Sequence, residues 1–443
     1  MFNPTIYRAY DIRGVVPQEL DAEEMYHMGR AYAQFTGAKR VVVARDMRPT
    51  GDDLEPALIR GLTEGGVDVI RIGLATSPMF YFAVHKLKAE GGVMVTASHN
   101  PGVYNGAKMT REEAIPISGD TGLYEIRDLV EQRSWGSVER VGSITEADVR
   151  EEYLSLVTQG VSAQGLKIVV DAGNGMTGML LGDVFARLGG EIVPLYWDLD
   201  GTFPNHEADP LKPENMEDLE AAVREHKADM GVAFDGDGDR VFFMTEAGTT
   251  IPGDITTALI AGEILKEHPG TPIIYDLRAS RTTAEVISEA GGQPLMWKVE
   301  HSLIKPKMRE SGAHFAGEVS GHFFFAPWYA ESGLLALNYM LRILQREKKP
   351  FSEVVSPLLR RAKTPEINFA VTDKDAILAR LKEKYSDAEK IVDFDGIRID
   401  YADWWFNVRP SNTEPKLRLN MEADTQALLD QKQAEIEQLI KQS

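Results

Sequence analysis

Short apolar runs alternate along this chain with segments of helix length, and the alternation occurs three times in the same form. In each copy an apolar run ends in polar residues, a helix-length segment follows, and a Gly-Gly pair leads into a second apolar run. The copies cover residues 41–70, 168–193 and 273–295. This order predicts three strand–helix–strand units in mostly parallel, buried sheets. Such units are common in α/β proteins, but the similar lengths of the copies favour three related domains.

Polar segments divide the chain further. Residues 134–148 separate the first copy from the second, the second ends near residues 251–254, and the third ends near residues 364–366. The predicted domains are residues 1–150, 151–254, 255–366 and 367–443. The last part differs from the others, because its pattern predicts a helix over 374–385, several short strands and an amphipathic helix over 425–441. A smaller two-layer α+β domain fits this pattern.

Composition narrows the function classes. Of 443 residues, 43% are hydrophobic and 26% are charged, and the formal net charge is −20. This acidity argues against nonspecific nucleic-acid binding, although a few basic residues in one cleft can still bind a small phosphorylated substrate. The chain has no cysteine, which excludes disulfides, thiolate zinc sites and cysteine nucleophiles and predicts a cytoplasmic protein. No apolar run approaches the roughly 18 residues of a membrane span, and no signal peptide is expected.

A serine is the first candidate for chemistry. Residues 92–95 form an apolar run that predicts a buried strand, and Asn100-Pro101 ends it in a turn. Ser98, with His99 beside it, therefore lies on a loop at a strand end, where α/β proteins usually place reacting groups. A turn or helix-capping serine is the alternative. Lys108 is close enough in sequence to share the same pocket, or it is an ordinary surface lysine.

Residues 235–240, Asp-Gly-Asp-Gly-Asp-Arg, follow an apolar run and indicate a cation site. Alternate residues of an extended segment point the same way, so the carboxylates of Asp235, Asp237 and Asp239 converge. Oxygen ligands of this kind suit Mg²⁺ or Ca²⁺ rather than zinc. An EF-hand is disfavoured because Arg240 takes the place of its glycine and the flanks are predicted strands. A solvated acidic turn is the remaining alternative, in which the carboxylates would repel one another.

Two more loops carry groups that suit a phosphosugar. Residues 409–415, Arg-Pro-Ser-Asn-Thr-Glu-Pro, lie between two strand-like runs and offer hydroxyls, an amide and N–H groups in a tight turn. Arg409 supplies a fork that matches phosphate oxygens, and Arg418 could support the same anion. The other loop is residues 317–322, Gly-Glu-Val-Ser-Gly-His. Its Glu318 and Ser320 lie on the same side of the chain, which suits hydrogen bonding to adjacent sugar hydroxyls. A plain hairpin loop and a plain turn are the respective alternatives.

Two motifs of nucleotide enzymes are absent. Residues 173–178 have the glycine spacing of a P-loop, but Met179 follows where lysine is required. No G-x-G-x-x-G opens a helix after the first strand. A nucleotide-driven kinase or a dinucleotide enzyme is therefore unsupported.

Taken together, these loops resemble those of the α-D-phosphohexomutase superfamily. The serine loop (96–101), the metal loop (235–240), the sugar loop (317–322) and the phosphate loop (409–415) occur in the superfamily's order and approximate spacing. Residues 10–14 and 105–108 also match, so the resemblance covers essentially the whole chain. Within the superfamily the chain is most similar to bacterial and archaeal phosphomannomutases, on residues 116–122, 317–322 and 406–415. Many of these enzymes also accept glucose phosphates.

The resemblance implies four domains around a central cleft, three related α/β domains and a smaller C-terminal one. It also implies interconversion of mannose 6-phosphate and mannose 1-phosphate. Ser98 would be carried as phosphoserine, with one Mg²⁺ held by Asp235, Asp237, Asp239 and a phosphate oxygen of Ser98. The phosphoryl group would pass to the free hydroxyl of a hexose monophosphate. The resulting hexose 1,6-bisphosphate, also the activator, would return its other phosphate to Ser98.

The resemblance assigns roles to the other candidates. Lys108 and His301 are expected to transfer protons, with His99 beside the nucleophile and Arg13 orienting them. The expected substrate-binding residues are Tyr10, Arg240, Arg278, Glu318, Ser320, His322, Arg409, Ser411, Asn412, Thr413 and Arg418. Three positions depart from the family's pattern. Glu300 stands before His301 where glycine is common, Arg278 where lysine is common, and Ala107 where a bulkier residue is common.

Three hypotheses remain: a phosphomannomutase or phosphomannomutase/phosphoglucomutase, a phosphoglucosamine mutase, and a non-catalytic phosphosugar-binding protein. Phosphoglucosamine mutases usually carry Gln at the position of Val319 and Gly at that of Asn412, which favours the first. No catalytic loop carries a disabling substitution, which disfavours the third. The expected partner is a small phosphosugar substrate, and binding to nucleic acid or to a membrane is not expected. The expected oligomeric state is a monomer or homodimer.

Overall fold

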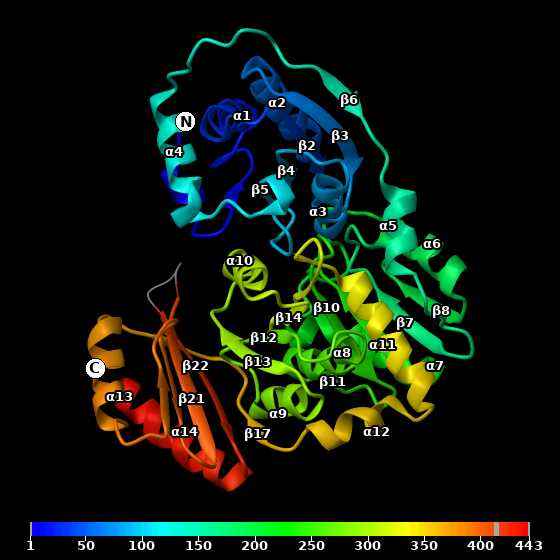
Figure 1. Cartoon of the computed structure of the whole chain (residues 1–443), viewed down its shortest axis with the longest axis vertical. Coiled ribbons are helices and arrows are strands. Elements are labelled where there is room, and N and C mark those ends of the chain that lie inside the picture. The colour runs from blue at the N-terminus through cyan, green and yellow to red at the C-terminus, as the bar shows by residue number, and fades with distance from the viewer. Residues whose placement is uncertain (1, 412–415, 442–443) are drawn as a thin grey trace.

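Four sheets, each flanked by its own helices, build the computed structural model of the chain, which describes residues 2–411 and 416–441 (Figure 1). The first sheet has the order β1-β5-β4-β2-β3-β6. Its strands are β1 (Ile12–Val15), β2 (Arg40–Arg45), β3 (Asp68–Leu74), β4 (Gly91–Val95), β5 (Tyr104–Arg111) and β6 (Ile144–Glu146). Its helices are α1 (Ala22–Thr36), α2 (Gly51–Glu64), α3 (Ser77–Lys86) and α4 (Leu123–Gln132).

The second and third sheets have the orders β11-β10-β9-β7-β8 and β13-β12-β14-β15-β16. The second unit contains α5 (Arg150–Val157), β7 (Lys167–Asp171), α6 (Gly178–Leu188), β8 (Glu191–Leu195), α7 (Glu217–His226), β9 (Met230–Phe234), β10 (Val241–Thr245) and β11 (Thr250–Ile251). The third contains α8 (Gly253–Glu267), β12 (Pro272–Asp276), α9 (Arg281–Glu289), β13 (Gln293–Trp297), α10 (His301–Ser311), β14 (Phe315–Gly317), β15 (Phe323–Phe325), β16 (Ala330–Glu331), α11 (Gly333–Glu347) and α12 (Phe351–Val355).

The three predicted strand–helix–strand units are confirmed. The pairs β2–β3, β7–β8 and β12–β13 are parallel, and α2, α6 and α9 join them. At the turns before the second strands, Gly66, Gly190 and Gly291 have φ angles of 87°, 95° and 79°. Glycine adopts this left-handed region without steric cost, which explains the recurring Gly pairs. Antiparallel strands complete each sheet, so all three domains are mixed α/β.

The C-terminal unit is smaller and antiparallel. Its strands are β17 (Ala362–Lys363), β18 (Ile367–Ala370), β19 (Lys390–Val392), β20 (Ile397–Asp400), β21 (Trp404–Pro410) and β22 (Lys416–Ala423). The predicted helices are confirmed as α13 (Lys374–Lys384) and α14 (Gln426–Lys441). Its buried side chains, Trp404, Phe406 and Ile436 among them, form a core of their own. Arg398 docks it on the third unit by donating to the backbone carbonyls of Leu277 and Ala279.

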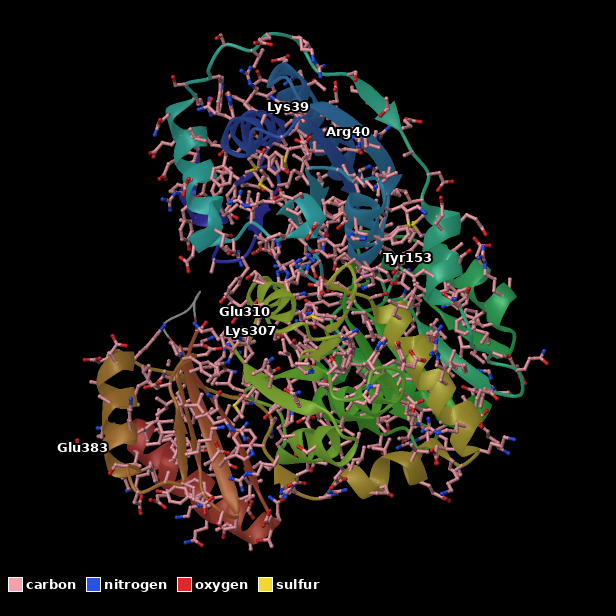
Figure 2. All side chains as sticks on the ribbon, viewed as in Figure 1. Lys39, Arg40, Tyr153, Lys307, Glu310 and Glu383 are labelled. Atoms are coloured by element: carbon pink, nitrogen blue, oxygen red, sulfur yellow. The ribbon has the colours of Figure 1, made fainter. Side chains whose placement is uncertain are left out.

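The first three units share packing. Tyr153 on α5 (Figure 2) lies where they meet, because its ring centroid is 5.6 Å from that of Phe82 on α3 and its hydroxyl is 3.2 Å from Ser332 Oγ before α11. Single turns of 3₁₀ helix lie at Pro4–Ile6, Glu112–Ala114, Gly119–Thr121, Pro213–Met216 and Ser356–Leu358. In the part of the chain that the structure describes, no helix is both long and apolar enough to cross a bilayer.

Candidate active site

Ser98 follows β4 on a loop with a strained backbone. Its φ of 50° is in the left-handed region, which residues other than glycine rarely adopt. The Ser98 N–H donates to Thr96 Oγ1 at 2.9 Å, and the Thr96 hydroxyl donates to Asp46 Oδ2 at 2.7 Å. Only 2% of Ser98 is exposed, and that part lines a cavity. The loop therefore presents its hydroxyl to an enclosed space rather than to open solvent.

Arg48, which sequence reasoning missed, fastens this loop. Its fully buried guanidinium pairs with Asp46 at 3.2 Å. Its other N–H groups donate to the backbone carbonyls of Ser98, Asn100, Pro101 and Tyr104 at 2.6–2.8 Å. The ring of Phe203, from the second unit, lies 5.2 Å from the guanidinium carbon. One arginine thus fixes the path of the serine loop and ties it to the neighbouring unit.

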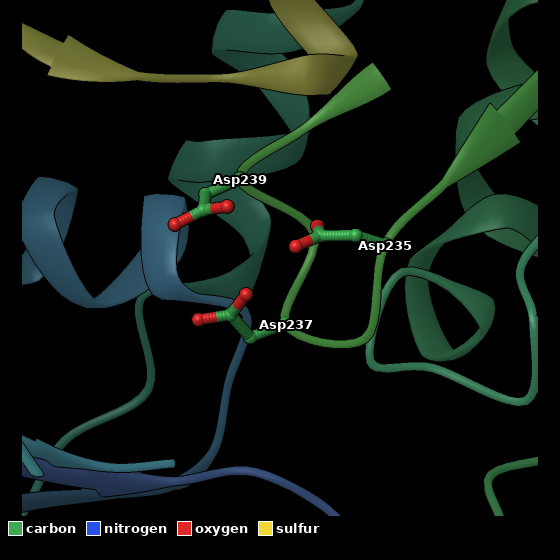
Figure 3. A group of neighbouring side chains, drawn as sticks. All are labelled: Asp235, Asp237 and Asp239. Atoms are coloured by element: carbon green, nitrogen blue, oxygen red, sulfur yellow. The ribbon is translucent and has the colours of Figure 1, made fainter. Parts of the chain in front are cut away.

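Three carboxylates on the loop between β9 and β10 face a common space (Figure 3). Asp235, Asp237 and Asp239 are buried, and each offers an oxygen within 4.8 Å of the others. The Ser98 hydroxyl donates to Asp235 Oδ2 at 3.1 Å. The Oδ1 atoms of Asp237 and Asp239 are buried and have no hydrogen-bond partner among the described residues. Buried carboxylate oxygens that accept no hydrogen bond are suitable ligands for a hard divalent cation.

Lys108, on β5, neutralises part of this charge. Its Nζ lies 2.6 Å from Asp237 Oδ2 and 2.6 Å from Asp239 Oδ2. Burial alone would lower the pKa of Lys108, but the two carboxylates outweigh it and raise the pKa well above its usual value. Burial, and then the charges of Asp239 and Asp237, raise the pKa of Asp235. One ammonium beside three buried carboxylates leaves a surplus of negative charge for a cation.

Two further candidates, His99 and Arg13, lie within or close to the serine loop. His99 Nδ1 lies 3.2 Å from Ser98 Oγ, and burial followed by the charge of Arg240 lowers the pKa of His99, so its ring is neutral at pH 7. Arg13 pairs with Asp11 at 2.7 Å and donates to the side-chain carbonyl of Asn100. Arg13 is thereby tied to the serine loop.

His322 connects the sugar loop with the metal loop. Its Nδ1 lies 3.0 Å from Glu318 Oε2 and 3.2 Å from Ser320 Oγ, and its Nε2 lies 3.4 Å from Asp239 Oδ1. Burial alone would lower the pKa of His322, but Asp239 outweighs it and raises the pKa to about 9. His322 lines the cavity, whereas Glu318 and Ser320 are not among the described residues that line it.

Arg278 forms an ion pair with a neighbouring carboxylate. Its guanidinium pairs with Asp276 at 2.8 Å, and both side chains are buried. Asp276 Oδ2 also accepts from the N–H of Val319, in the sugar loop, at 2.7 Å. The structure therefore places Arg278 as a support of the sugar loop, outside the residues that line the cavity.

The phosphate loop lies at the turn of the β21–β22 hairpin. Arg409 and Arg418 are directly opposite each other across the two strands, an arrangement in which like charges repel. Glu366 lies 3.3 Å from Arg409 Nη2 and 3.4 Å from Arg418 Nη1, so one carboxylate serves two guanidiniums. The Nε atoms of both arginines are buried without a hydrogen-bond partner in residues 2–411 and 416–441. Asn412 and Thr413 lie outside the described residues.

One cavity of about 260 Å³ brings most of the candidates together, with residues from all four units. The predicted residues that line it are Tyr10, Arg13, Ser98, His99, Lys108, Asp239, Arg240, His301, His322, Arg409, Ser411 and Arg418. Asp235 and Asp237 lie behind Ser98 and Lys108, with which they are in contact. Arg8, Ala9, Asp11 and Glu300 complete the lining. The sequence offers no signal for Arg8 and Ala9 beyond their nearness to Tyr10.

Glu300 is the unusual residue of the lining. Its φ of 109° and ψ of 128° lie in a region that is essentially restricted to glycine, at a cost of about 1–3 kcal/mol. Its N–H donates to Glu318 Oε1 at 2.8 Å. Burial, and then the nearby charge of Glu318, raise the pKa of the Glu300 carboxyl. This departure from glycine therefore places backbone strain in the lining of the cavity.

Comparison with known proteins agrees with this geometry. Four family models match in succession: phosphoglucomutase/phosphomannomutase domain I over residues 4–136, domain II over 151–248, domain III over 252–362 and the C-terminal domain over 366–439. A phosphomannomutase/phosphoglucomutase of Pseudomonas aeruginosa is 40% identical over 439 residues, covering 96% of this chain and 93% of that protein. A phosphomannomutase of Escherichia coli is 40% identical over 455 residues, covering 99% of each.

Among solved structures, a phosphoglucomutase/phosphomannomutase family protein from Burkholderia thailandensis superposes with a TM-score of 0.92 at 39% identity. The match covers 100% of this chain and 98% of that one. The family resemblance and the fold class expected from the sequence are thus confirmed. The chain belongs to the phosphoglucomutase/phosphomannomutase family of α-D-phosphohexomutases.

Proposed function

We propose that this chain is a phosphohexomutase that interconverts mannose 6-phosphate and mannose 1-phosphate and also accepts glucose phosphates. One observation carries the proposal: a single cavity holds a buried serine backed by three carboxylates on one wall and an opposed pair of arginines on another. The first wall suits a metal-assisted phosphoryl carrier, and the second suits the phosphate that does not react.

Ser98 is the phosphoryl carrier in this proposal. The bond between Ser98 Oγ and phosphorus breaks as a sugar hydroxyl forms the new bond, and the hydroxyl proton passes to a base on the protein. The product of this step is a hexose 1,6-bisphosphate and a free Ser98 hydroxyl. After the bisphosphate has reversed its orientation, its other phosphoryl group returns to Ser98. Lys108 and His301 are the candidates for holding and returning the proton.

Asp235, Asp237 and Asp239 would hold one Mg²⁺, because their carboxylates are buried and two of the oxygens have no hydrogen-bond partner in the described chain. When bound, this ion neutralises charge on the transferring phosphoryl group. Hexose 1,6-bisphosphate also serves as the activator that loads Ser98. We further propose a cytoplasmic monomer or homodimer with no nucleic-acid partner, and domains at residues 1–150, 151–254, 255–366 and 367–443.

Glucosamine phosphate is a second candidate substrate, favoured by Glu300. Its side chain lines the cavity and lies near Glu318, so it adds to the pocket an acidic group that the ammonium of an amino sugar would neutralise.

A substrate panel with a matched variant tests these assignments. Wild type is expected to convert mannose 1-phosphate and glucose 1-phosphate, and Ser98→Ala is expected to lose all measurable turnover. Chelation of divalent cations should abolish activity and Mg²⁺ should restore it. Dominant kcat/KM for glucosamine 1-phosphate would replace the first substrate class with the second, and turnover by Ser98→Ala would overturn the mechanism.

A further inference from the structure

A cluster of buried charges lies behind His301, and the mechanism above does not use it. Glu331 on β16 and Lys305 on α10 have fully buried side chains. Glu331 Oε1 lies 3.2 Å from His301 Nδ1, and Glu331 Oε2 lies 2.6 Å from Lys305 Nζ. Tyr81, on α3 of the first unit, places its ring centroid 3.7 Å from the same ammonium. A buried charge network at this position calls for a function, because such groups are costly to desolvate.

The network acts on one side of α10. His301 and Lys305 are one helical turn apart and share one carboxylate, whereas Pro306 and Glu310, on the opposite side of the helix, are exposed. There, Lys307 and Glu310 pair with each other at 2.8 Å (Figure 2). Burial alone would raise the pKa of Glu331, but Lys305 and then His301 outweigh it and lower the pKa. Glu331 is therefore an ionised carboxylate in contact with the imidazole.

A carboxylate beside Nδ1 determines where the imidazole carries its proton. An ionised carboxylate only accepts hydrogen bonds, so a bare Nδ1 lone pair facing it would be repelled. The contact is not a well-aligned hydrogen bond, and its effect is chiefly electrostatic. In the described part of the chain, Glu331 is the one carboxylate within 4 Å of a His301 nitrogen. Asp11, Glu300 and His322 are the other titratable groups nearby.

We propose that Glu331 is a positioning residue that keeps a proton on Nδ1 of His301, so that Nε2 is the nitrogen that exchanges a proton with the substrate. Lys305 balances the charge of Glu331 and keeps it ionised inside the protein. The proposal rests on the proposed function, because it assumes that His301 takes part in proton transfer. His301 lines the cavity with 13% of its side chain exposed, so the ring is in contact with the space that the substrate would fill.

The direct test is the tautomer of His301, measured by two-bond proton–nitrogen correlation on histidine-labelled full-length protein. The His301→Asn variant identifies the signal. In wild type at a pH where the ring is neutral, Nδ1 is expected to be protonated and Nε2 unprotonated. Glu331→Gln combined with Lys305→Met removes both buried charges together, and in this variant we expect the proton to move to Nε2, the form that a free neutral histidine prefers. Its kcat should fall at least tenfold with little change in KM.

Glu310→Gln is the matched control, since it breaks an ion pair on the exposed side of the same helix. It should leave the tautomer and kcat unchanged. A wild-type ring protonated on Nε2 would overturn the proposal without any variant, and so would an unchanged tautomer in the folded double variant. Absence of mutase turnover in wild type would instead contradict the proposed function, while the tautomer could still be read.

Discussion

At one wall of the cavity Ser98 and the carboxylates of Asp235, Asp237 and Asp239 are almost inaccessible, whereas at the other Arg418 keeps 29% of its side chain exposed. The first wall is built from segments far apart in the chain, with Arg48 and Lys108 linking them. The second is built from one hairpin of a domain that has its own core.

The two walls also differ in the groups that they leave unpaired. Two carboxylate oxygens, Oδ1 of Asp237 and of Asp239, have no hydrogen-bond partner at the first wall, and two guanidinium nitrogens, Nε of Arg409 and of Arg418, have none at the second, all within the described residues. Burying a polar group without a hydrogen-bond partner is costly, so each wall is complementary to a ligand of opposite charge. The difference fits the proposed function, which assigns the cation and the reaction to the first wall and anion binding to the second.

Removing Arg48 should damage the first wall most. Arg48→Met leaves Asp46 as a buried unpaired carboxylate and four loop carbonyls without donors, so we expect a loss of about 3–5 kcal/mol in unfolding free energy. We also expect a fall in kcat/KM of roughly 100-fold, because the serine loop loses its position. Denaturant unfolding and initial rates measure the two effects. Arg140→Met, which removes an exposed ion pair with Asp68, is the control and should change neither quantity much. An Arg48→Met protein as stable as wild type would contradict the role of Arg48 in fixing the serine loop.

The second wall should respond in binding rather than in chemistry. Arg409→Leu removes charge-assisted contacts of about 1.5–3 kcal/mol, which corresponds to an increase in KM of roughly ten- to a hundredfold. Glu366→Gln should have the opposite effect, since it frees both arginines from their resident carboxylate. The inhibition constant of inorganic phosphate measures both changes. Weaker phosphate inhibition in Glu366→Gln would contradict the role of Glu366.

Backbone strain between the two walls predicts a smaller effect of opposite sign. Glu300→Gly relieves the strained φ of 109°, and after the entropy cost of glycine the net gain in unfolding free energy should be about 1 kcal/mol. Glu300→Gln keeps the Cβ atom and removes the charge, so it separates strain from electrostatics. Thermal unfolding of the three proteins decides: equal midpoints for Glu300→Gly and Glu300→Gln would assign no part of the effect to the backbone.

The smallest expected effect concerns the pH dependence of the stability of the C-terminal unit. Burial alone would raise the pKa of Glu435 on α14, but hydrogen bonds from Lys384, Tyr385 and Lys432 outweigh it and lower the pKa to about 2. A folded-state pKa below the ordinary value of 4.5 stabilises this unit above pH 4.5, and the stabilisation is lost as the pH falls towards 2. Unfolding at pH 5 and pH 3 should therefore differ less in Glu435→Gln than in wild type. An identical pH dependence would show that Glu435 does not contribute.

Whether a feature of the structure can be predicted from the sequence depends on how far apart in the chain the interacting residues lie. The strand–helix–strand units and the convergence of Asp235, Asp237 and Asp239 depend on local periodicity, and both are present in the structure. Arg48 donates hydrogen bonds to backbone carbonyls at least 50 residues away in sequence, and no local sequence pattern predicts such contacts. Glu331, 30 residues after His301 in sequence, is likewise placed beside it only by the fold.

Arg278 illustrates the converse. The family resemblance implies a substrate contact for Arg278, but the sequence does not show that Asp276 pairs with its guanidinium. Glu300 is intermediate, because the departure from glycine was visible in the sequence while its strained φ required the fold.

The most direct test of the phosphoryl carrier is the intact mass of the protein before and after incubation with hexose 1,6-bisphosphate and Mg²⁺, followed by peptide mapping. We predict that wild type gains one phosphoryl group on Ser98, that a hexose monophosphate then removes it, and that Ser98→Ala gains none. A mass that does not change in either direction, or a phosphoryl group on another residue, would contradict the assignment of Ser98.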